Sequence, residues 1–191
     1  MFTPEIVKEY DQEGMLTLIE TFPKQVQEAV EIGKKADLGN LAEQIKEINA
    51  IVFLGMGGSA IGGDLVKAVL AKELKVPMLV NREYHIPAFV NEKTLVIASS
   101  YSGNTEETIS ALKEAIQKKA MIFCITTGGK IAEIAKANGL PLIIIPSGIS
   151  PRAALGYSFF PILEVFCRLS LVADKNEDIK ETVFLLRDMK N

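Results

Sequence analysis

The sequence predicts an α/β protein with a five-stranded parallel β-sheet between layers of helices. Short apolar runs rich in β-branched residues recur along the 191-residue chain, and helical patterns separate them. Glycine-rich or hydroxyl-rich stretches follow several of these runs at their carboxyl ends. This alternation of strand and helix favours parallel strands joined by right-handed crossovers, with both faces of the sheet covered.

Each expected strand is bounded by a turn signal or by the start of a helical pattern. The helical pattern after the first strand begins beyond Asp64, and Asn138-Gly139 is a helix stop. The expected strands are 51–54, 76–80, 94–98, 121–125 and 142–145. The expected helices that follow the first, third, fourth and fifth of them are 65–74, 106–118, 130–137 and 153–172.

Helical segments flank the strand-rich part of the chain at both ends. Residues 3–47 read as helical, with Pro23 in the first turn of a helix over 23–34. We expect residues 1–48 to pack on the sheet domain at 49–173 or on a partner subunit. Residues 174–191 have a helical stripe with no stop signal, so we expect a helix that links to a second domain. A solvated terminal helix is the alternative.

The overall composition excludes several classes of protein. The formal net charge is −3, so the chain lacks the basic footprint of a nucleic-acid-binding protein. No apolar run has the length of a transmembrane helix, and the N-terminus does not resemble a signal peptide. Cys124 and Cys167 lie in apolar patterns without metal-type spacing, which favours buried thiols in a reducing cytoplasm. His85 is the single histidine, which excludes a multi-histidine metal site.

The first expected strand runs into a glycine-rich stretch, Gly55-Met56-Gly57-Gly58-Ser59-Ala60-Ile61-Gly62-Gly63-Asp64. Glycines at the junction of a strand and a helix permit positive φ and let a ligand approach the backbone. The helix that follows directs free N–H groups and the positive end of its dipole at the same place. This arrangement suits an anion, phosphate above all.

The third expected strand runs into a hydroxyl-rich stretch, Ser99-Ser100-Tyr101-Ser102-Gly103-Asn104-Thr105. A helix N-cap requires one such side chain, and this stretch supplies several. Since carboxyl ends of parallel strands share one edge of a sheet, both stretches and Arg152 are expected to meet near the reversal of strand order. Three hydroxyls with helix N–H groups can bind a phosphomonoester without a lysine.

Two other phosphate-binding motifs come close to this pattern. Residues 55–60 satisfy the dinucleotide pattern G-x-G-x-x-G/A, and Glu83 lies about where an acid would bind a ribose. A nicotinamide-binding domain is therefore an alternative. A Walker A loop is excluded, because no Gly-Lys-Ser/Thr sequence occurs.

The segments 55–64, 100–108 and 151–154 (GMGGSAIGGD, SYSGNTEET and PRAA) resemble the sugar isomerase (SIS) domain family. More narrowly, they resemble the bifunctional phosphoglucose/phosphomannose isomerases of archaea and some bacteria, from about residue 10 onward. The resemblance implies a three-layer αβα sandwich of flavodoxin-like type. It also implies interconversion of glucose 6-phosphate and mannose 6-phosphate with fructose 6-phosphate, no cofactor or metal, and a homodimer.

The resemblance also implies roles for particular residues. Ser100, Ser102 and Thr105 match phosphate-binding hydroxyls, and Gly58 and Ser59 match positions that contact the sugar. Arg152 matches an arginine that stabilises the negative charge of an enediolate, a role that suits a permanently charged, forked guanidinium.

The base and the ring-opening acid belong to the second SIS domain in the resembled family, and would lie beyond Asn191. His85 does not match the family histidine and reads as a surface or connector residue. Glu106 and Glu107 match carboxylates that a helix N-terminus favours, so neither is assigned as the base. A non-catalytic sugar-phosphate sensor and a single-domain isomerase that acts as an oligomer remain open.

Overall fold

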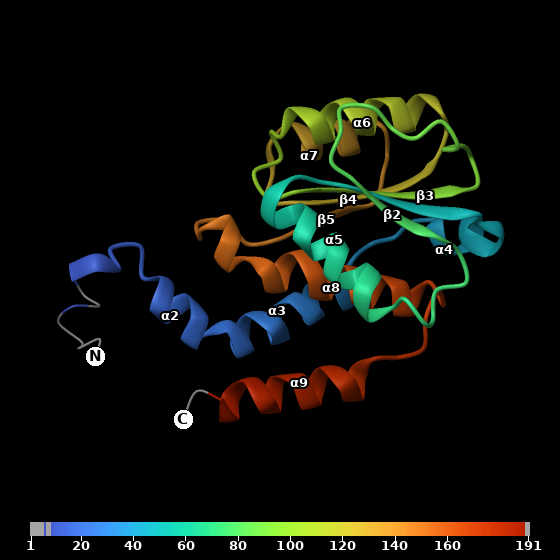
Figure 1. Ribbon diagram of the computed structural model, residues 1–191. Helices are drawn as coiled ribbons and strands as arrows, with labels where there is room; N and C mark the ends of the chain where they lie inside the picture. The colour runs from blue at the N-terminus through green and yellow to red at the C-terminus, as the bar shows by residue number, and fades with distance from the viewer. Residues whose placement is uncertain (1–5, 7–8, 190–191) are drawn as a thin grey trace.

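The computed structural model describes residue 6 and residues 9–189 (Figure 1). All five strands are parallel, and their order across the sheet is β2-β1-β3-β4-β5. The predicted α/β class with a five-stranded parallel sheet is therefore confirmed. The strands are β1 (Ala50–Leu54), β2 (Met78–Asn81), β3 (Thr94–Ser100), β4 (Met121–Thr126) and β5 (Leu142–Ile144).

The central strands are buried on both faces, which explains their continuous apolar sequences. Successive side chains of a strand point to opposite faces. In β1, Ile51 and Phe53 join the larger core on the lower face of the sheet in Figure 1, whereas Val52 and Leu54 join the smaller core on the upper face.

Helices cover both faces, as the strand–helix alternation predicts (Figure 1). The upper face carries α6 (Glu106–Gln117) and α7 (Gly129–Ala137). The lower face carries α3 (Phe22–Lys35), α5 (Gly57–Val69) and α8 (Leu155–Arg168). The pronounced burial of α8 follows from its position between α3 and α5.

The N-terminal helix α3 is part of the lower layer. Gln25 joins it to the start of α8, since its amide donates to the Ala153 carbonyl at 2.9 Å and accepts from the Gly156 N–H at 2.8 Å. At the other end of α3, the Arg168 guanidinium donates to the carbonyls of Gly33 and Ala36 at 2.8 and 2.7 Å. These bonds satisfy polar groups near the ends of both helices and fix their alignment.

Shorter elements complete the chain. A one-turn helix α4 (Leu41–Gln44) and a 3₁₀ turn η1 (Ile45–Glu47) lead into β1. The helix α2 (Met15–Glu20) precedes α3 and extends away from the sheet, and α9 (Asn176–Asp188) runs beneath α3 (Figure 1). None of the helices in the described residues is long and apolar enough to cross a membrane.

The expected start of the first crossover helix is wrong. The helix α5 begins at Gly57, so most of the glycine-rich stretch is helical. The glycines permit close packing: a Cβ on Gly62 would lie 2.4 Å from the Ser158 carbonyl oxygen of α8, and one on Gly63 would lie 2.6 Å from the Phe53 ring. Gly62 and Gly63 therefore serve the contacts of α5 with α8 and the sheet, at a cost in helix propensity.

Other expected boundaries shift as well, and α5 ends at Val69 rather than at residue 74. The strand β3 continues to Ser100, because Ser99 and Ser100 pair with Ile125 and Thr126 of β4. The strand β2 starts at Met78, two residues later than expected. The helix α8 spans 155–168 rather than 153–172, because a separate 3₁₀ turn, η2 (Pro151–Ala153), precedes it and the helix ends before Leu169.

Candidate functional site

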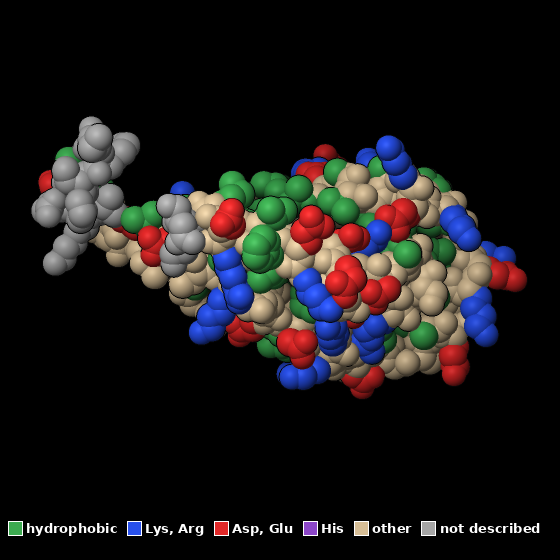
Figure 2. Space-filling view, turned by 90° about the horizontal axis from the view of Figure 1, so that it is seen from below, with side chains coloured by type: hydrophobic (Ala, Val, Ile, Leu, Met, Phe, Trp, Pro, Cys, Tyr) green, Lys and Arg blue, Asp and Glu red, His purple; other side chains and the backbone are tan. Residues whose placement is uncertain are grey.

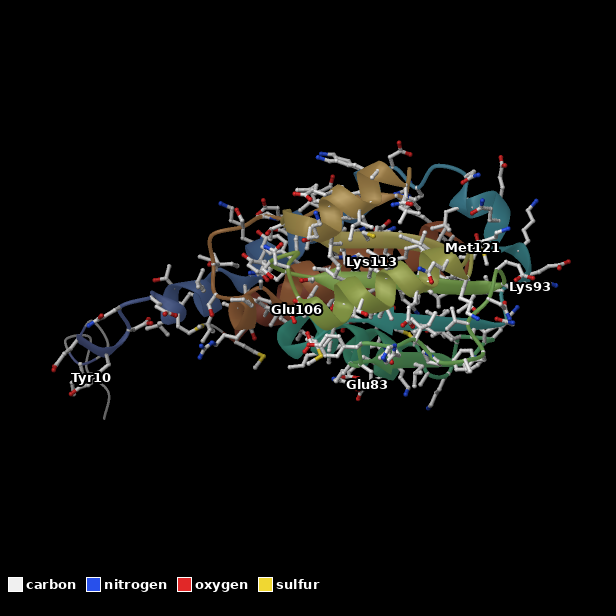
Figure 3. All side chains as sticks on the ribbon, turned by 90° about the horizontal axis from the view of Figure 1, so that it is seen from above. Tyr10, Glu83, Lys93, Glu106, Lys113 and Met121 are labelled. Carbon is white, nitrogen blue, oxygen red and sulfur yellow. The ribbon has the colours of Figure 1, made fainter. Side chains whose placement is uncertain are left out.

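The reversal of strand order lies between β1 and β3, which are neighbours in the sheet but lead to helices on opposite faces. In open α/β sheets this crevice, outside the carboxyl ends of the strands, is where ligands bind. The start of α5 follows β1 here, and the hydroxyl-rich stretch follows β3. In Figure 3 Glu106, at the start of α6, lies at the opposite end of the sheet from Lys93 and Met121.

Residues 100–105 form one tight turn, which we call the serine turn. The hydroxyls of Ser100 and Thr105 are 2.9 Å apart and hydrogen-bonded. The Gly103 N–H donates to Ser100 Oγ at 3.1 Å, and the Asn104 N–H donates to Ser102 Oγ at 3.2 Å. Ser100 is buried, Thr105 half-buried and Ser102 exposed. The three hydroxyls expected to bind phosphate are thus gathered around one glycine.

Gly103 makes this turn possible. Its φ is +71°, a conformation that L-residues with side chains rarely adopt. A Cβ at this position would lie 1.8 Å from the Gly128 carbonyl oxygen and 2.8 Å from Thr126 Oγ1. The serine turn therefore packs directly on the loop after β4, and only glycine fits between them.

The first turn of α6 leaves backbone donors available beside the serine turn. Thr105 occupies the N-cap position, yet its side chain makes no capping hydrogen bond and pairs with Ser100 instead. The first N–H groups of an α-helix have no partner within the helix. Together with the positive end of the helix dipole, they form a site suited to an anion.

Ser59 connects the glycine-rich stretch to the serine turn. It lies in the first turn of α5, is 8% exposed, and its Oγ accepts a hydrogen bond from the Tyr101 N–H at 3.1 Å. Ser59 therefore lies next to the crevice, and its hydroxyl already makes a structural hydrogen bond. The same contact fixes the distance between the two segments that flank the β1–β3 crevice.

The serine turn is held from two further sides. The Tyr101 carbonyl accepts from the Thr127 N–H and the Thr127 hydroxyl, at 3.0 and 2.8 Å. The Tyr101 hydroxyl accepts from the Ile149 N–H at 3.3 Å, and the Gly103 carbonyl accepts from the Ile131 N–H at 2.9 Å. A turn held by neighbours on both sides is preorganised, which lowers the cost of ordering it around a ligand.

Gly58 and Arg152 lie on neighbouring segments. A Cβ on Gly58 would lie 3.2 Å from the Pro151 carbonyl oxygen, so the start of α5 and η2 are in close contact. The Arg152 side chain is exposed and lines a cavity toward α2. Within the described part of the chain it has neither a hydrogen-bond nor an ion-pair partner. The structure thus brings the Arg152 segment to Gly58, while the side chain is free to reorient.

Two acidic residues lie beside this site, at the start of α6. Glu106 and Glu107 occupy the first turn of α6, as expected for carboxylates favoured by the helix dipole. The Tyr84 hydroxyl donates to Glu106 Oε2 at 3.4 Å. The negative charge of Glu107, with a smaller contribution from Glu106, raises the pKa of Tyr84 above its ordinary value.

His85 lies outside the site and belongs to the connector between β2 and β3. Its Nδ1 is 2.6 Å from Glu114 Oε1, in the middle of α6, and the Ile86 N–H donates to Glu114 Oε2 at 3.0 Å. The bonds from Ile86 and His85 lower the pKa of Glu114. The His85 side chain is 83% exposed, consistent with a surface connector residue.

Potential metal ligands are not clustered in the described part of the chain. Among the residues that the structure describes, no three His, Cys, Asp or Glu side chains are grouped so that they could hold a metal ion. Both cysteines are free; Cys124 is buried in the upper core, which raises its pKa to about 12, and Cys167 is half-buried. The Cys124 thiol is accordingly a packing group, and the Cys167 thiol donates to the Ala173 carbonyl at 3.3 Å.

The sequence predicts that residues 126–129 lie at the same edge of the sheet, but it does not predict that they support the serine turn through Tyr101. Thr126 ends β4, Thr127 and Gly128 follow it, and in the sequence Tyr101 is one member of a hydroxyl-rich stretch. The signal available in the sequence was the cluster of Thr and Gly at the end of β4. Its meaning depends on β4 being the neighbour of β3, which the order of strands along the chain does not reveal.

The chain is similar in sequence or in fold to several known proteins. The SIS domain model matches residues 44–159. A bifunctional phosphoglucose/phosphomannose isomerase from Caldicellulosiruptor bescii is 49% identical over 176 residues, which are 92% of this chain and 51% of the relative. One from Thermoplasma acidophilum is 45% identical over 139 residues, which are 73% of this chain and 41% of the relative.

A solved structure, the C-terminal domain of glucosamine-fructose-6-phosphate aminotransferase from Francisella tularensis, matches with a TM-score of 0.72 at 17% identity. The match covers 96% of this chain and 56% of that one, and it supports the fold. The chain spans about half the length of the curated relatives that it matches. The family model covers most of the sheet domain, including the serine turn, and the chain belongs to the SIS domain family.

Proposed function

We propose that this chain is the phosphosugar-binding domain of an aldose–ketose isomerase that interconverts glucose 6-phosphate and mannose 6-phosphate with fructose 6-phosphate. The serine turn and the free N–H groups of α6 bind the phosphate through Ser100, Ser102 and Thr105. Gly58 and Ser59 contact the sugar. The relatives from C. bescii and T. acidophilum, both named as phosphoglucose/phosphomannose isomerases, support this substrate class.

The observation that carries the proposal is the arrangement of Thr105. A threonine at an N-cap position ordinarily bonds to the helix N–H groups. Here its hydroxyl is turned to Ser100 instead, so the N–H groups of α6 remain available next to a cluster of hydroxyls. A phosphate dianion placed there would receive both hydroxyl and N–H donors, with no metal, cofactor or lysine required.

The reaction proceeds through a cis-enediol and needs three kinds of group. A base carries a proton between C2 and C1, an acid opens the ring, and a cation stabilises the oxyanion of the intermediate. Arg152 supplies the cation, since its guanidinium has no ion-pair partner among the residues that the structure describes and the preceding residue, Pro151, adjoins Gly58. We place the base and the acid in a second SIS domain, as the family resemblance implies; the chain covers 51% of the C. bescii relative, which leaves room for such a domain.

The same reasoning extends to the organisation of the protein. Residues 49–173 form the phosphosugar-binding domain, the N-terminal segment 1–48 packs on it through α3, and the C-terminal segment 174–191, which contains α9, leads toward the second domain. The protein acts as a homodimer in the cytoplasm, in glycolysis, gluconeogenesis and carbohydrate metabolism. A nicotinamide-binding domain and a non-catalytic sugar-phosphate sensor are the alternatives.

Ligand-induced stabilisation tests the proposal. A ligand that binds only the folded chain at a hundred times its Kd stabilises it by about 2.7 kcal/mol. Glucose 6-phosphate and fructose 6-phosphate should raise the Tm of the 191-residue chain, whereas NAD should not. Stabilisation by NAD alone would contradict the proposal. Isomerisation by the isolated chain at ordinary enzyme rates would show that its base lies within these 191 residues.

A further inference from the structure

A cavity that shares no residue with the proposed phosphosugar site lies at the opposite edge of the sheet, where the strands begin. Its volume is about 500 Å³, within the range of about 300–1,000 Å³ that small-molecule pockets have. It is formed by α4 and η1, by the loop before β2, and by the end of α8. In Figure 1 these segments lie toward the right, and the start of α5 lies at the other end of the sheet.

The lining of this cavity combines an apolar floor with positive charge. The floor includes the side chains of Ile45, Ile48, Leu74, Val76, Leu169 and Leu171. The polar groups come from Lys46, Lys75, Arg168 and Ser170. No aspartate or glutamate is among these described lining residues, although the whole chain has a net charge of −3. Figure 2 shows Lys and Arg side chains, with acidic ones among them, over this right-hand end of the molecule.

Carboxylates do not neutralise the two lysines of the cavity. Neither Lys46 nor Lys75 has an ion-pair partner within the described residues. The adjacent acids, Glu47 and Glu73, form ion pairs with two other lysines, outside the cavity lining. Glu43, on α4, does not line the cavity either. The ammonium groups are therefore available to an anion that enters the cavity.

Arg168 has a fixed orientation at this cavity. Its Nη1 donates to the carbonyls of Gly33 and Ala36 at 2.8 and 2.7 Å, and its other guanidinium nitrogens have no partner within the described residues. The nearby carboxyl of Glu164, one turn earlier on α8, is 7% exposed and does not line the cavity. A guanidinium that is already oriented loses little freedom when it binds a carboxylate or phosphate.

Helix C-termini at this edge account for only part of the positive charge. The helices α5 and α8 both end beside the cavity, and cations near a helix C-terminus interact favourably with its dipole. Each helix end carries the equivalent of about half a negative charge, so two ends offset about one of the three positive charges. About two positive charges remain for a ligand.

The end of α8 places a serine in an unfavourable backbone conformation at the cavity. Ser170 has a φ of +57°, and its N–H donates to the Cys167 carbonyl at 2.9 Å. The Leu171 N–H donates to the Phe166 carbonyl at 3.0 Å, which completes a Schellman motif, where glycine is usual. Serine fits this backbone less well than glycine, but it adds a hydroxyl donor to the lining that holds Arg168.

We infer that this cavity binds a small organic anion with an apolar body and one carboxylate or phosphate group. The apolar body packs on the floor, and the anionic group binds to the three cations and to the Ser170 hydroxyl. Burial of apolar surface supplies affinity, and the cations supply selectivity for an anion over a neutral molecule of the same shape. The inference does not rest on the proposed phosphosugar function, because the two sites share no residue.

Four simple probes test the ligand class on the 191-residue chain. Octanoate and octyl phosphate combine an apolar body with an anionic group, whereas octanol lacks the charge and acetate lacks the apolar body. We expect octanoate or octyl phosphate to raise the Tm and, in calorimetry, to bind at least about tenfold more tightly than octanol and acetate. Equal affinities for the charged probes and octanol overturn the inference, and so does the absence of binding by both charged probes.

A pair of lysine substitutions tests the place of binding. Lys46→Gln with Lys75→Gln should weaken the binding of octanoate and octyl phosphate about tenfold or more, because charge-assisted hydrogen bonds are lost. The matched control is Lys113→Gln with Lys136→Gln, which removes the same charge from exposed lysines on α6 and α7 and should leave the affinity unchanged. Circular dichroism establishes that the variants are folded. Equal effects of the two pairs overturn the inference, because the attraction then depends on net charge alone.

Two further measurements separate this site from structural effects and from the phosphosugar site. Ser170→Gly should raise the Tm of the ligand-free chain, since glycine suits a positive φ, and should weaken binding of the charged probes. Unchanged affinity in this variant would contradict the Ser170 contact. Saturating glucose 6-phosphate should leave the Kd of the charged probes unchanged. Competition between glucose 6-phosphate and these probes would place them in the β1–β3 crevice and overturn the inference.

Discussion

The Ser59 hydroxyl accepts a hydrogen bond from the Tyr101 N–H at 3.1 Å across the crevice between β1 and β3. The two residues are 42 positions apart in the sequence and belong to the two segments that flank the proposed site. Ser59 is thus a structural link between the start of α5 and the serine turn. Any contact it makes with a sugar would be added to this link.

Replacing Ser59 tests the importance of that link. Ser59→Ala leaves the half-buried Tyr101 N–H without its partner, and an unsatisfied buried donor costs about 1–3 kcal/mol. We expect a lower free energy of unfolding by urea and weaker binding of glucose 6-phosphate in calorimetry. The control is Ser147→Ala, an exposed serine on the loop before η2. Equal behaviour of the two variants would contradict a linking role.

The paired hydroxyls of Ser100 and Thr105 are expected to act as a unit. Hydrogen bonds to a charged group are worth about 1.5–3 kcal/mol each, so Ser100→Ala or Thr105→Val alone should weaken glucose 6-phosphate binding about tenfold or more. Because their oxygens are 2.9 Å apart, the double variant should lose less than the sum of the two single losses. Calorimetric titration of all four proteins gives this double-mutant cycle. Strict additivity, or unchanged affinity, would contradict the proposed site.

Gly103 is expected to be irreplaceable for a reason beyond its positive φ. Gly103→Ala places a Cβ 1.8 Å from the Gly128 carbonyl oxygen, so the loop after β4 has to move. Gly139→Ala is the matched control, since Gly139 has a φ of +61° with no atom near its Cβ position. The control should cost about 1–2 kcal/mol in the free energy of unfolding. Gly103→Ala should cost clearly more and abolish phosphosugar binding, as urea unfolding and calorimetry would measure.

Glu164 is expected to destabilise the folded chain at neutral pH. It lies in α8 at 7% exposure, and burial raises the pKa of its carboxyl above the ordinary value. Below the ordinary pKa of about 4.3 the carboxyl is protonated in both states and costs nothing. As the pH rises through the ordinary and then the raised pKa, the unfolded state gains from ionisation first, so stability falls.

The isosteric variant Glu164→Gln should therefore have a higher Tm than the wild type at pH 7.5, by about 2 °C. The difference should shrink toward zero near pH 3.5. Glu181→Gln, on the exposed face of α9, serves as the control and should show no such trend. A variant that is less stable than the wild type at pH 7.5 would show that the Glu164 charge has a stabilising partner.

The sequence by itself determined the fold class, the five strands and the clustering of hydroxyls. Runs such as 51–54 and 121–125 are apolar throughout because both faces of the sheet are buried, and that periodicity is visible without coordinates. The excess of hydroxyls around Gly103 is equally local. Both signals depend on residues close together in the chain.

Only the tertiary structure determined the features that depend on contacts between segments far apart in the sequence. The glycine-rich stretch becomes helical from Gly57 because α5 must approach Ser158 and Phe53 closely, a requirement set by segments far away in the sequence. Likewise, Thr127 supports the serine turn only because β4 lies beside β3. A single sequence records which residues could pack at short distance, and the order of strands determines which of them do.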